Sequence, residues 1–115
     1  GAADEMSVNR KLYERGTILT MLQQNRGLEW PIAFMPFLRA LHLINLPLAP
    51  QGLREHLEYL SQRGYVALTR REDLPGYRTS GLRTDERPDQ IMLVKLTARA
   101  MDLIEGTISD EGVFI

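Results

Sequence analysis

The run LPLAP at residues 46–50 constrains the fold more than any other part of the sequence. A helix cannot continue through Pro47 and Pro50, because proline lacks a backbone N–H and its ring clashes with the preceding turn. Apolar residues nevertheless recur at helical spacing on both sides of the run, in 36–45 and in 50–63. The chain must therefore make a short turn between two helices.

The second of these helices has the clearest boundaries. Pro50 suits the first helical position, and Gly64 suits the position just past the end. Leu53, Leu57 and Leu60 fall on one face and are expected in the core. The residues that point away from them are Gln51, Glu55, Glu58 and Gln62, flanked by Arg54 and Tyr59.

Two strand-like runs follow this helix. Tyr65–Thr69 and Ile91–Leu96 are both rich in β-branched and aromatic residues, and Pro-Gly at 75–76 marks a turn between them. Thr97 then suits the N-cap of a short last helix that ends at Gly106. The pattern predicts a β-hairpin followed by a helix.

A first helix is expected upstream, over Val8–Gln24, where apolar residues again recur at helical spacing. We take residues 1–7 as a disordered N-terminus or a tag remnant, and 8–106 as one domain. Residues 107–115 form a C-terminal tail that either folds back on the domain or packs on a second copy.

The expected order is helix, helix, short turn, helix, hairpin, helix. A helix–turn–helix followed by a β-hairpin is the plan of a winged-helix domain, in which the third helix usually enters the major groove of DNA. We therefore predict an α+β winged helix–turn–helix with three helices, a β-hairpin wing and a C-terminal helix.

Two stretches also carry a resemblance to a known family. LREHLEYLSQRGYVAL (53–68) looks like the third helix and first wing strand of many winged-helix proteins, and LTARAMDLIEGTISDEGV (96–113) is more particular. Together they resemble small, mostly uncharacterised winged-helix proteins of Mu-like phages and prophages. The resemblance implies DNA binding by analogy of fold. The chain departs from that family in a longer wing loop and a proline-rich approach to the second helix.

The charge is unevenly distributed along the chain. The formal net charge is −1, but Met6 to Met101 holds 14 basic against 9 acidic residues, a net charge of +5. The remaining acids lie near the two ends of the sequence. A mildly basic body is compatible with a nucleic-acid partner and does not require one.

The third helix offers candidate base contacts on its outer face. Gln51 and Arg54 carry the donors that read base edges in the major groove. Glu55 and Glu58 lie on the same face and would repel phosphates. The alternative is a solvated helix face, and the sequence does not separate these two interpretations.

The segment between the strands, RREDLPGYRTSGLRTDERPD (70–89), is the second candidate. Its five acids gather near its two ends, and its centre is free of acids. Arginine in a loop can insert into a narrow minor groove. We therefore predict DNA contacts from the arginines of this segment; the alternative is a disordered polar loop. These arginines are Arg70, Arg71, Arg78, Arg83 and Arg87.

Other classes of function have little support. His42 and His56 lie on different expected helices and belong to no metal-binding motif, and the chain has no cysteine. Phosphate-binding loops and nucleophile elbows are also absent from the sequence. We expect no enzyme activity, no metal, no cofactor and no small-molecule ligand. No apolar run is long enough to span a membrane, and a cytoplasmic location in a bacterial host is expected.

Two hypotheses about function follow. In the first, the chain binds double-stranded DNA as a small transcriptional regulator or DNA-associated accessory factor of a phage or prophage. In the second, the same scaffold is a protein–protein interaction module that does not bind DNA. A homodimer through the first and last helices is compatible with either hypothesis.

Overall fold

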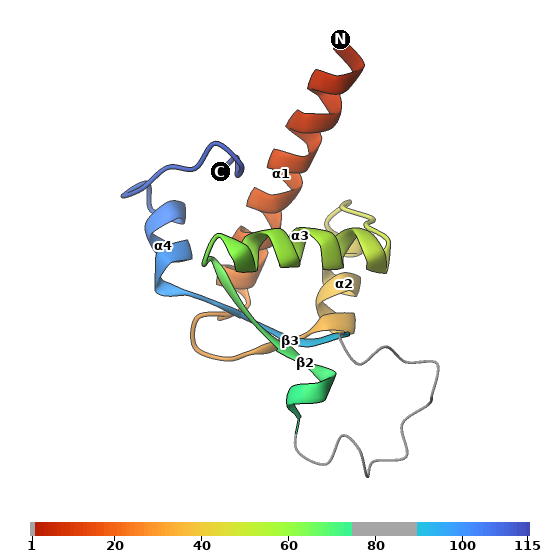
Figure 1. The fold of residues 1–115 in the computed structure, drawn as a ribbon, viewed down its shortest axis with the longest axis vertical. Helices are drawn as coiled ribbons and strands as arrows, with labels where there is room; N and C mark the ends of the chain where they lie inside the picture. The colour runs from red at the N-terminus through yellow and green to blue at the C-terminus, as the bar shows by residue number, and fades with distance from the viewer. Residues whose placement is uncertain (1, 75–89) are drawn as a thin grey trace.

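The computed structural model describes residues 2–74 and 90–115, drawn as a ribbon in Figure 1. This part of the chain is α+β, with four α-helices, one 3-10 turn and a three-stranded antiparallel sheet. The elements in chain order are α1 (Ala2–Gln24), β1 (Ile32–Ala33), α2 (Phe34–Leu43), α3 (Pro50–Gln62), β2 (Val66–Arg70), η1 (Arg71–Asp73), β3 (Ile91–Leu96) and α4 (Ala98–Ile104).

Local sequence signals explain where the later elements begin and end. Pro50 occupies the first turn of α3, and Gly64 follows the helix with a φ of 82°, a conformation that glycine adopts readily. The Thr97 side chain accepts a hydrogen bond from the Ala100 N–H and so caps α4. Gly106, after α4, also has a positive φ of 85°. The predicted positions of α3, β3 and α4 are confirmed.

The sheet has the order β1-β3-β2, with both pairs antiparallel. In the register, Val66 lies opposite Leu96 and Ile32 lies opposite Val94. The predicted hairpin pair is therefore present, but a third strand, β1, joins it from the segment before α2. Its pairing partner could not be predicted from the sequence, because β3 lies about sixty residues further along the chain.

The core lies between the sheet and the inner faces of the helices. Leu19 and Leu22 of α1 and Leu57 of α3 are fully buried, as their spacing predicted. Leu41 of α2 is fully buried as well. Ile44 falls on the same face by its spacing, yet it is 45% exposed, because α2 ends at Leu43.

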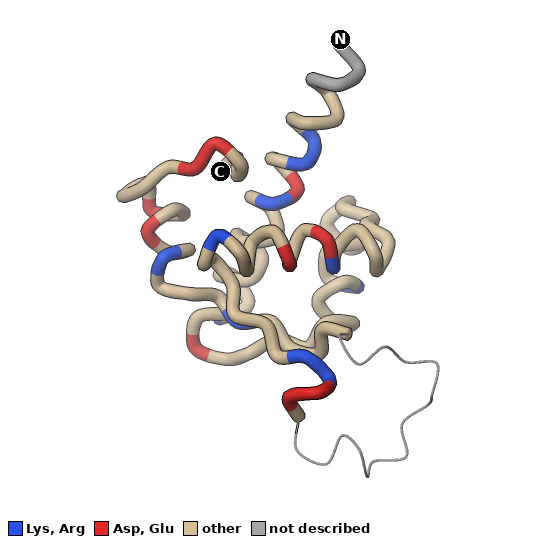
Figure 2. Tube along the Cα trace, viewed as in Figure 1, with Lys and Arg blue, Asp and Glu red and all other residues tan. Residues whose placement is uncertain are grey.

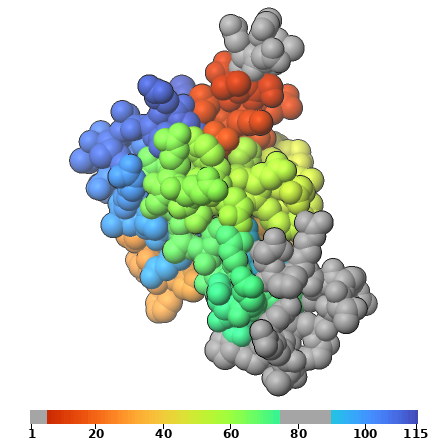
Figure 3. Space-filling model, in the orientation of Figure 1, coloured from red at the N-terminus to blue at the C-terminus, as the bar shows by residue number. Residues whose placement is uncertain are grey.

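Helix α1 is longer than predicted. Its start was placed at Val8, with residues 1–7 outside the fold, yet the helix extends back to Ala2. Its first turns stand clear of the body of the domain (Figures 1 and 3). All side chains from Met6 to Lys11 are exposed. The apolar Val8 therefore does not contribute to the core, although it lies in line with the buried stripe.

Candidate functional site

Helix α3 crosses one broad face of the domain (Figure 3), and basic and acidic residues both lie along it (Figure 2). The predicted contacts Gln51 and Arg54 lie together on its outer face. The Arg54 Nη1 donates to the Gln51 Oε1 at 3.0 Å, and the Gln51 Nε2 donates to the Glu55 Oε1 at 3.3 Å. The Arg54 guanidinium also lies 5.7 Å from the centre of the Phe34 ring. The side chains thus form a connected row on the first turns of α3.

Arg70 comes from β2 and pairs with the third helix. Its guanidinium makes a bidentate contact with the Glu58 carboxylate, Nη1 to Oε1 at 2.6 Å and Nη2 to Oε2 at 2.9 Å. The two side chains remain 27% and 40% exposed. The pair joins the strand to the helix and offsets the negative charge of Glu58 on the α3 face.

Arg71 does not lie on the surface, where the sequence prediction placed it. The residue is only 6% exposed. Its Nη2 donates to the Gln90 side-chain oxygen at 3.2 Å, and its backbone N–H donates to the Gln90 carbonyl at 2.9 Å. Arg71 thus holds the start of η1 against the chain that enters β3. Buried in this way, its guanidinium is poorly placed to contact a phosphate.

The other three predicted contacts, Arg78, Arg83 and Arg87, lie outside the described residues. Of the predicted set, the structure therefore brings Gln51 and Arg54 together and places Arg70 alongside α3 through Glu58. Arg71 lies apart from these in the interior.

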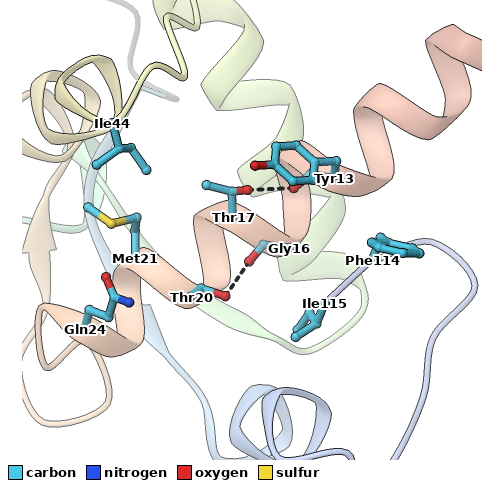
Figure 4. Close-up of a pocket in the computed structure, with 9 residues that line it drawn as sticks. All are labelled: Tyr13, Gly16, Thr17, Thr20, Met21, Gln24, Ile44, Phe114 and Ile115. Carbon is cyan, nitrogen blue, oxygen red and sulfur yellow. Dashed lines mark hydrogen bonds between the residues drawn. The ribbon is translucent and has the colours of Figure 1, made fainter.

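A second surface was not predicted at all. It is a groove of about 350 Å³ along α1. The residues that line it are Tyr13, Gly16, Thr17, Thr20, Met21, Gln24, Ile44, Phe114 and Ile115. Figure 4 shows Phe114 and Ile115 on one side of α1 and Ile44 and Met21 on the other. Tyr13, Phe114 and Ile115 are 60%, 67% and 53% exposed, so the groove has an uncovered apolar border.

The two threonine hydroxyls in this groove are already satisfied by the helix. The Thr17 Oγ1 donates to the Tyr13 carbonyl and the Thr20 Oγ1 donates to the Gly16 carbonyl, each at 2.9 Å (Figure 4). A partner that covered this face would therefore not strand these donors without an acceptor. These two hydroxyls therefore add little to the cost of burying the face.

The groove exists because the C-terminal tail packs directly on α1. The Phe114 N–H donates to the Leu12 carbonyl at 3.0 Å. A Cβ atom added at Gly16 would lie 1.8 Å from the Phe114 carbonyl oxygen, so only glycine admits the tail backbone there. An isolated glycine within a helical pattern was the available sequence signal, because glycine weakens helices and is retained where packing requires it.

Buried polar contacts hold the rest of the tail. The Tyr65 hydroxyl donates to the Asp110 Oδ2 at 2.5 Å, and the Gly112 N–H donates to Oδ1 at 2.7 Å. Arg15 of α1 donates to the Gly112 carbonyl at 3.0 Å, and its guanidinium lies 3.6 Å from the centre of the Tyr59 ring. The tail of residues 107–115, whose order the sequence left open, folds back on the domain.

These contacts move two pKa values in opposite directions. Burial raises the pKa of the Tyr65 hydroxyl, and its hydrogen bond to Asp110 raises it further. Burial alone would also raise the pKa of Asp110. The hydrogen bonds from Tyr65 and Gly112, with the nearby charges of Arg63 and Arg99, outweigh burial and lower the pKa of Asp110 below its ordinary value. The contact therefore favours a neutral tyrosine and an ionised aspartate.

The histidines have structural contacts. His56 is 8% exposed, and its Nε2 lies 3.0 Å from the Glu14 Oε1, which ties α3 to α1. His42 is exposed, and its Nε2 lies 2.7 Å from the Leu48 carbonyl oxygen. Within residues 2–74 and 90–115, no three His, Asp or Glu side chains gather as metal ligands would. None of the helices in that same part is both long and apolar enough to cross a membrane.

No protein-family model, curated protein or solved structure matches the chain. The residues themselves therefore carry the functional argument.

Proposed function

We propose that the chain is a winged-helix protein that binds double-stranded DNA, with α3 in the major groove. The order of its elements carries the proposal. A strand between the first two helices, a short turn into α3, and two further strands, of which β3 pairs with both β1 and β2, make up the plan of a winged helix. In such a domain the outer face of the third helix is the reading surface.

The charges on α3 are compatible with that role. In the sequence, Glu55 and Glu58 argued against DNA binding, because each carboxylate would repel phosphates. Arg70 now offsets Glu58 through two short contacts. On the first turns of α3, Gln51 and Arg54 remain at the surface, and both present donors of the kind that read base edges.

The biological role follows the resemblance to winged-helix proteins of Mu-like phages and prophages. We propose a small transcriptional regulator or a DNA-associated accessory factor that acts in the cytoplasm of the bacterial host. Arg78, Arg83 and Arg87 stay in this proposal as contacts with the backbone or the minor groove, on the strength of their sequence pattern alone.

Binding to a random duplex, followed by fluorescence anisotropy at several salt concentrations, tests the proposal. Affinity should fall steeply with salt, with a logarithmic slope of about 0.9 for each phosphate contact. Arg54→Ala should weaken binding, and an Arg78→Ala, Arg83→Ala double variant should flatten the slope. Lys11→Ala removes an exposed cation from α1, outside the proposed contact surface, and serves as the control, with binding unchanged. A wild-type chain that fails to bind at low salt contradicts the proposal.

A specific observation favours a second candidate function. The groove on α1 is apolar, uncovered and built from buried tail contacts, and an exposed apolar patch of this kind marks protein–protein contact. Under this alternative, the chain is a protein-interaction module on a winged-helix scaffold. Failure of the chain to bind DNA, together with loss of a protein partner when residues of the α1 groove are substituted, favours the protein-interaction module.

A further inference from the structure

We infer that Glu55 makes α3 selective for a cytosine in the major groove, where its carboxylate accepts a hydrogen bond from the N4 amino group of that base. The inference rests on the proposed DNA binding and deepens it, because it names a base that the binding site must contain. Its support comes from the place of Glu55 on α3, from the contacts of its carboxylate, and from the contrast with Glu58.

Glu55 lies on the part of α3 that would read base edges. In a helix–turn–helix, the N-terminal residues of the recognition helix contact the bases. α3 begins at Pro50, so Gln51 and Glu55 both fall within its first two turns, one turn apart on the same side. Both residues are exposed. Leu53 and Leu57, on the opposite side, are fully buried, so the packing of the helix fixes the outward direction of Glu55.

The two glutamates on this face have different partners (Figure 2). Arg70 binds the Glu58 carboxylate through contacts of 2.6 and 2.9 Å, which offset its negative charge. Among the described residues, the Glu55 side chain has one hydrogen bond, from the neutral Gln51 amide at 3.3 Å, and no ion pair. Glu55 therefore presents a carboxylate whose charge is not offset by a neighbouring cation of that part of the chain.

A carboxylate in this position restricts which bases the helix can bind. An ionised carboxylate only accepts hydrogen bonds. In the major groove, guanine offers N7 and O6 and thymine offers O4, and all of these atoms are acceptors. Cytosine and adenine offer an amino donor, but on adenine the acceptor N7 stands beside the donor and would repel the second carboxylate oxygen. Cytosine is therefore the base that Glu55 fits best.

Arg54 supplies the complementary contact. Arginine pairs with the O6 and N7 acceptors of guanine, which is the commonest specific contact in the major groove. Gln51 links the two charged side chains, because its Oε1 accepts from Arg54 at 3.0 Å and its Nε2 donates to Glu55 at 3.3 Å. These bonds hold a cationic donor and an anionic acceptor side by side on α3. The site should therefore contain G·C pairs where the first turns of α3 lie.

Selection of bound duplexes from a random-sequence library provides the first test. Wild type should require cytosine at one position of the selected site. Glu55→Ala should lose the preference at that position alone, and Glu55→Gln should prefer adenine there, because glutamine pairs with N6 and N7 of adenine. A wild-type site without this cytosine, or with adenine at the position that Glu55→Ala relaxes, overturns the inference.

A single modified base tests the hydrogen bond itself. N4-methylcytosine keeps the Watson–Crick pair but replaces the amino hydrogen that faces the major groove. In the selected site it should weaken wild-type binding by about 5- to 150-fold, the range for the loss of one matched base pair. It should leave the binding of Glu55→Ala unchanged. Equal losses in the two proteins would overturn the inference, because the amino group would then act without Glu55.

Affinity for a random duplex separates this inference from the proposed function. Glu55→Ala and Glu55→Gln should both bind a random duplex more tightly than wild type, because each removes a charge that repels phosphates. A weaker affinity in both would contradict the uncompensated charge on which the inference depends. Steep salt dependence without a cytosine preference leaves DNA binding standing and overturns only the role of Glu55. A wild-type chain that does not bind at low salt overturns both.

Glu105→Ala is the matched control for the charge change. Glu105 is an exposed glutamate at the end of α4, outside α3. Its replacement removes the same charge as Glu55→Ala and should leave the cytosine preference and the effect of N4-methylcytosine unchanged. A loss of the preference in Glu105→Ala would trace the effect to net charge and overturn the assignment to Glu55.

Discussion

Helices α1 and α3 each have an outer face exposed to solvent. The face of α3 is charged, whereas that of α1 is mainly apolar. On α3 the charged groups are tied to neighbours, Arg54 to Gln51 and Glu58 to Arg70. On α1 the groove face is mainly apolar, and its two threonine hydroxyls bond to the helix backbone. A charged face can bind a charged partner without being able to bury much surface, whereas the α1 face gains from any cover that excludes water.

The two helical glycines show the same contrast on a smaller scale. At Gly16 of α1, an added Cβ would collide with the tail backbone, whereas at Gly52 of α3 it would meet nothing within 4 Å. Glycine is a poor helix former in both places. Only on α1 is that weakness offset by a contact, so only there is the residue required by the fold.

Replacing both glycines gives one of the two largest expected effects and tests this contrast directly. Gly16→Ala should lower the free energy of unfolding by about 1–3 kcal/mol, because the new methyl group displaces the tail. Gly52→Ala should raise it by about 0.5–1 kcal/mol, through improved helix propensity alone. Urea unfolding of the two variants measures both values. Equal effects of the same sign would contradict the contrast between the helices.

The tail contact at Asp110 gives the next effect, which depends on pH. Asp110→Asn should lower the free energy of unfolding at neutral pH by about 1–3 kcal/mol, because it weakens buried charged hydrogen bonds. The pKa of Asp110 is lowered in the folded state, so its contribution is complete above the unfolded value and is lost as pH falls through the folded value. The difference between the two proteins should therefore shrink below about pH 4.

Tyr65→Phe is the companion variant for this prediction. Because the pKa of Tyr65 is raised in the folded state, the tyrosine contribution is present at neutral pH and is lost only above about pH 10. Chemical unfolding across the pH range measures both the loss of the Asp110 contribution at acid pH and the loss of the Tyr65 contribution at alkaline pH. A stability difference for Asp110→Asn that stayed constant down to acid pH would show that the carboxylate does not hold the tail.

The smallest effect concerns the ion pair that ties α3 to β2. Because Arg70 and Glu58 are both partly exposed, solvent screens their attraction, and we expect a coupling of only about 0.5 kcal/mol. A double-mutant cycle with Arg70→Ala and Glu58→Ala isolates this value from other losses. A coupling near zero would mean that Arg70 does not neutralise the α3 face.

Much of the fold was predictable because the signals were local. Pro50 and Gly64 bracket α3 in sequence, and Thr97 caps α4 within four residues of its partner N–H. The three leucines of α3 needed only their own spacing to be assigned to the core. Features of this kind depend on neighbours along the chain and are readable without knowing the tertiary structure.

The remaining features depend on distant residues. β1 is a strand of two residues that exists only because β3 accepts it, and no run of β-forming residues marks it. Arg70 and Arg71 look alike in sequence, yet one pairs with Glu58 and the other is buried beside Gln90. The groove requires the tail to meet α1 at Gly16. Each of these features depends on a contact with a segment far away in the sequence, and a single sequence does not reveal which segments come into contact.

The contact between Arg15 and Gly112 spans 97 residues. During synthesis, α1 therefore leaves the ribosome long before the segment that packs against it. Until that segment arrives, Gly16 sits in a helix with nothing to compensate for its low helix propensity. Helix α1 is therefore synthesised early, but the tail that packs on it is synthesised late. The domain can complete its native structure only after nearly all of these residues have emerged.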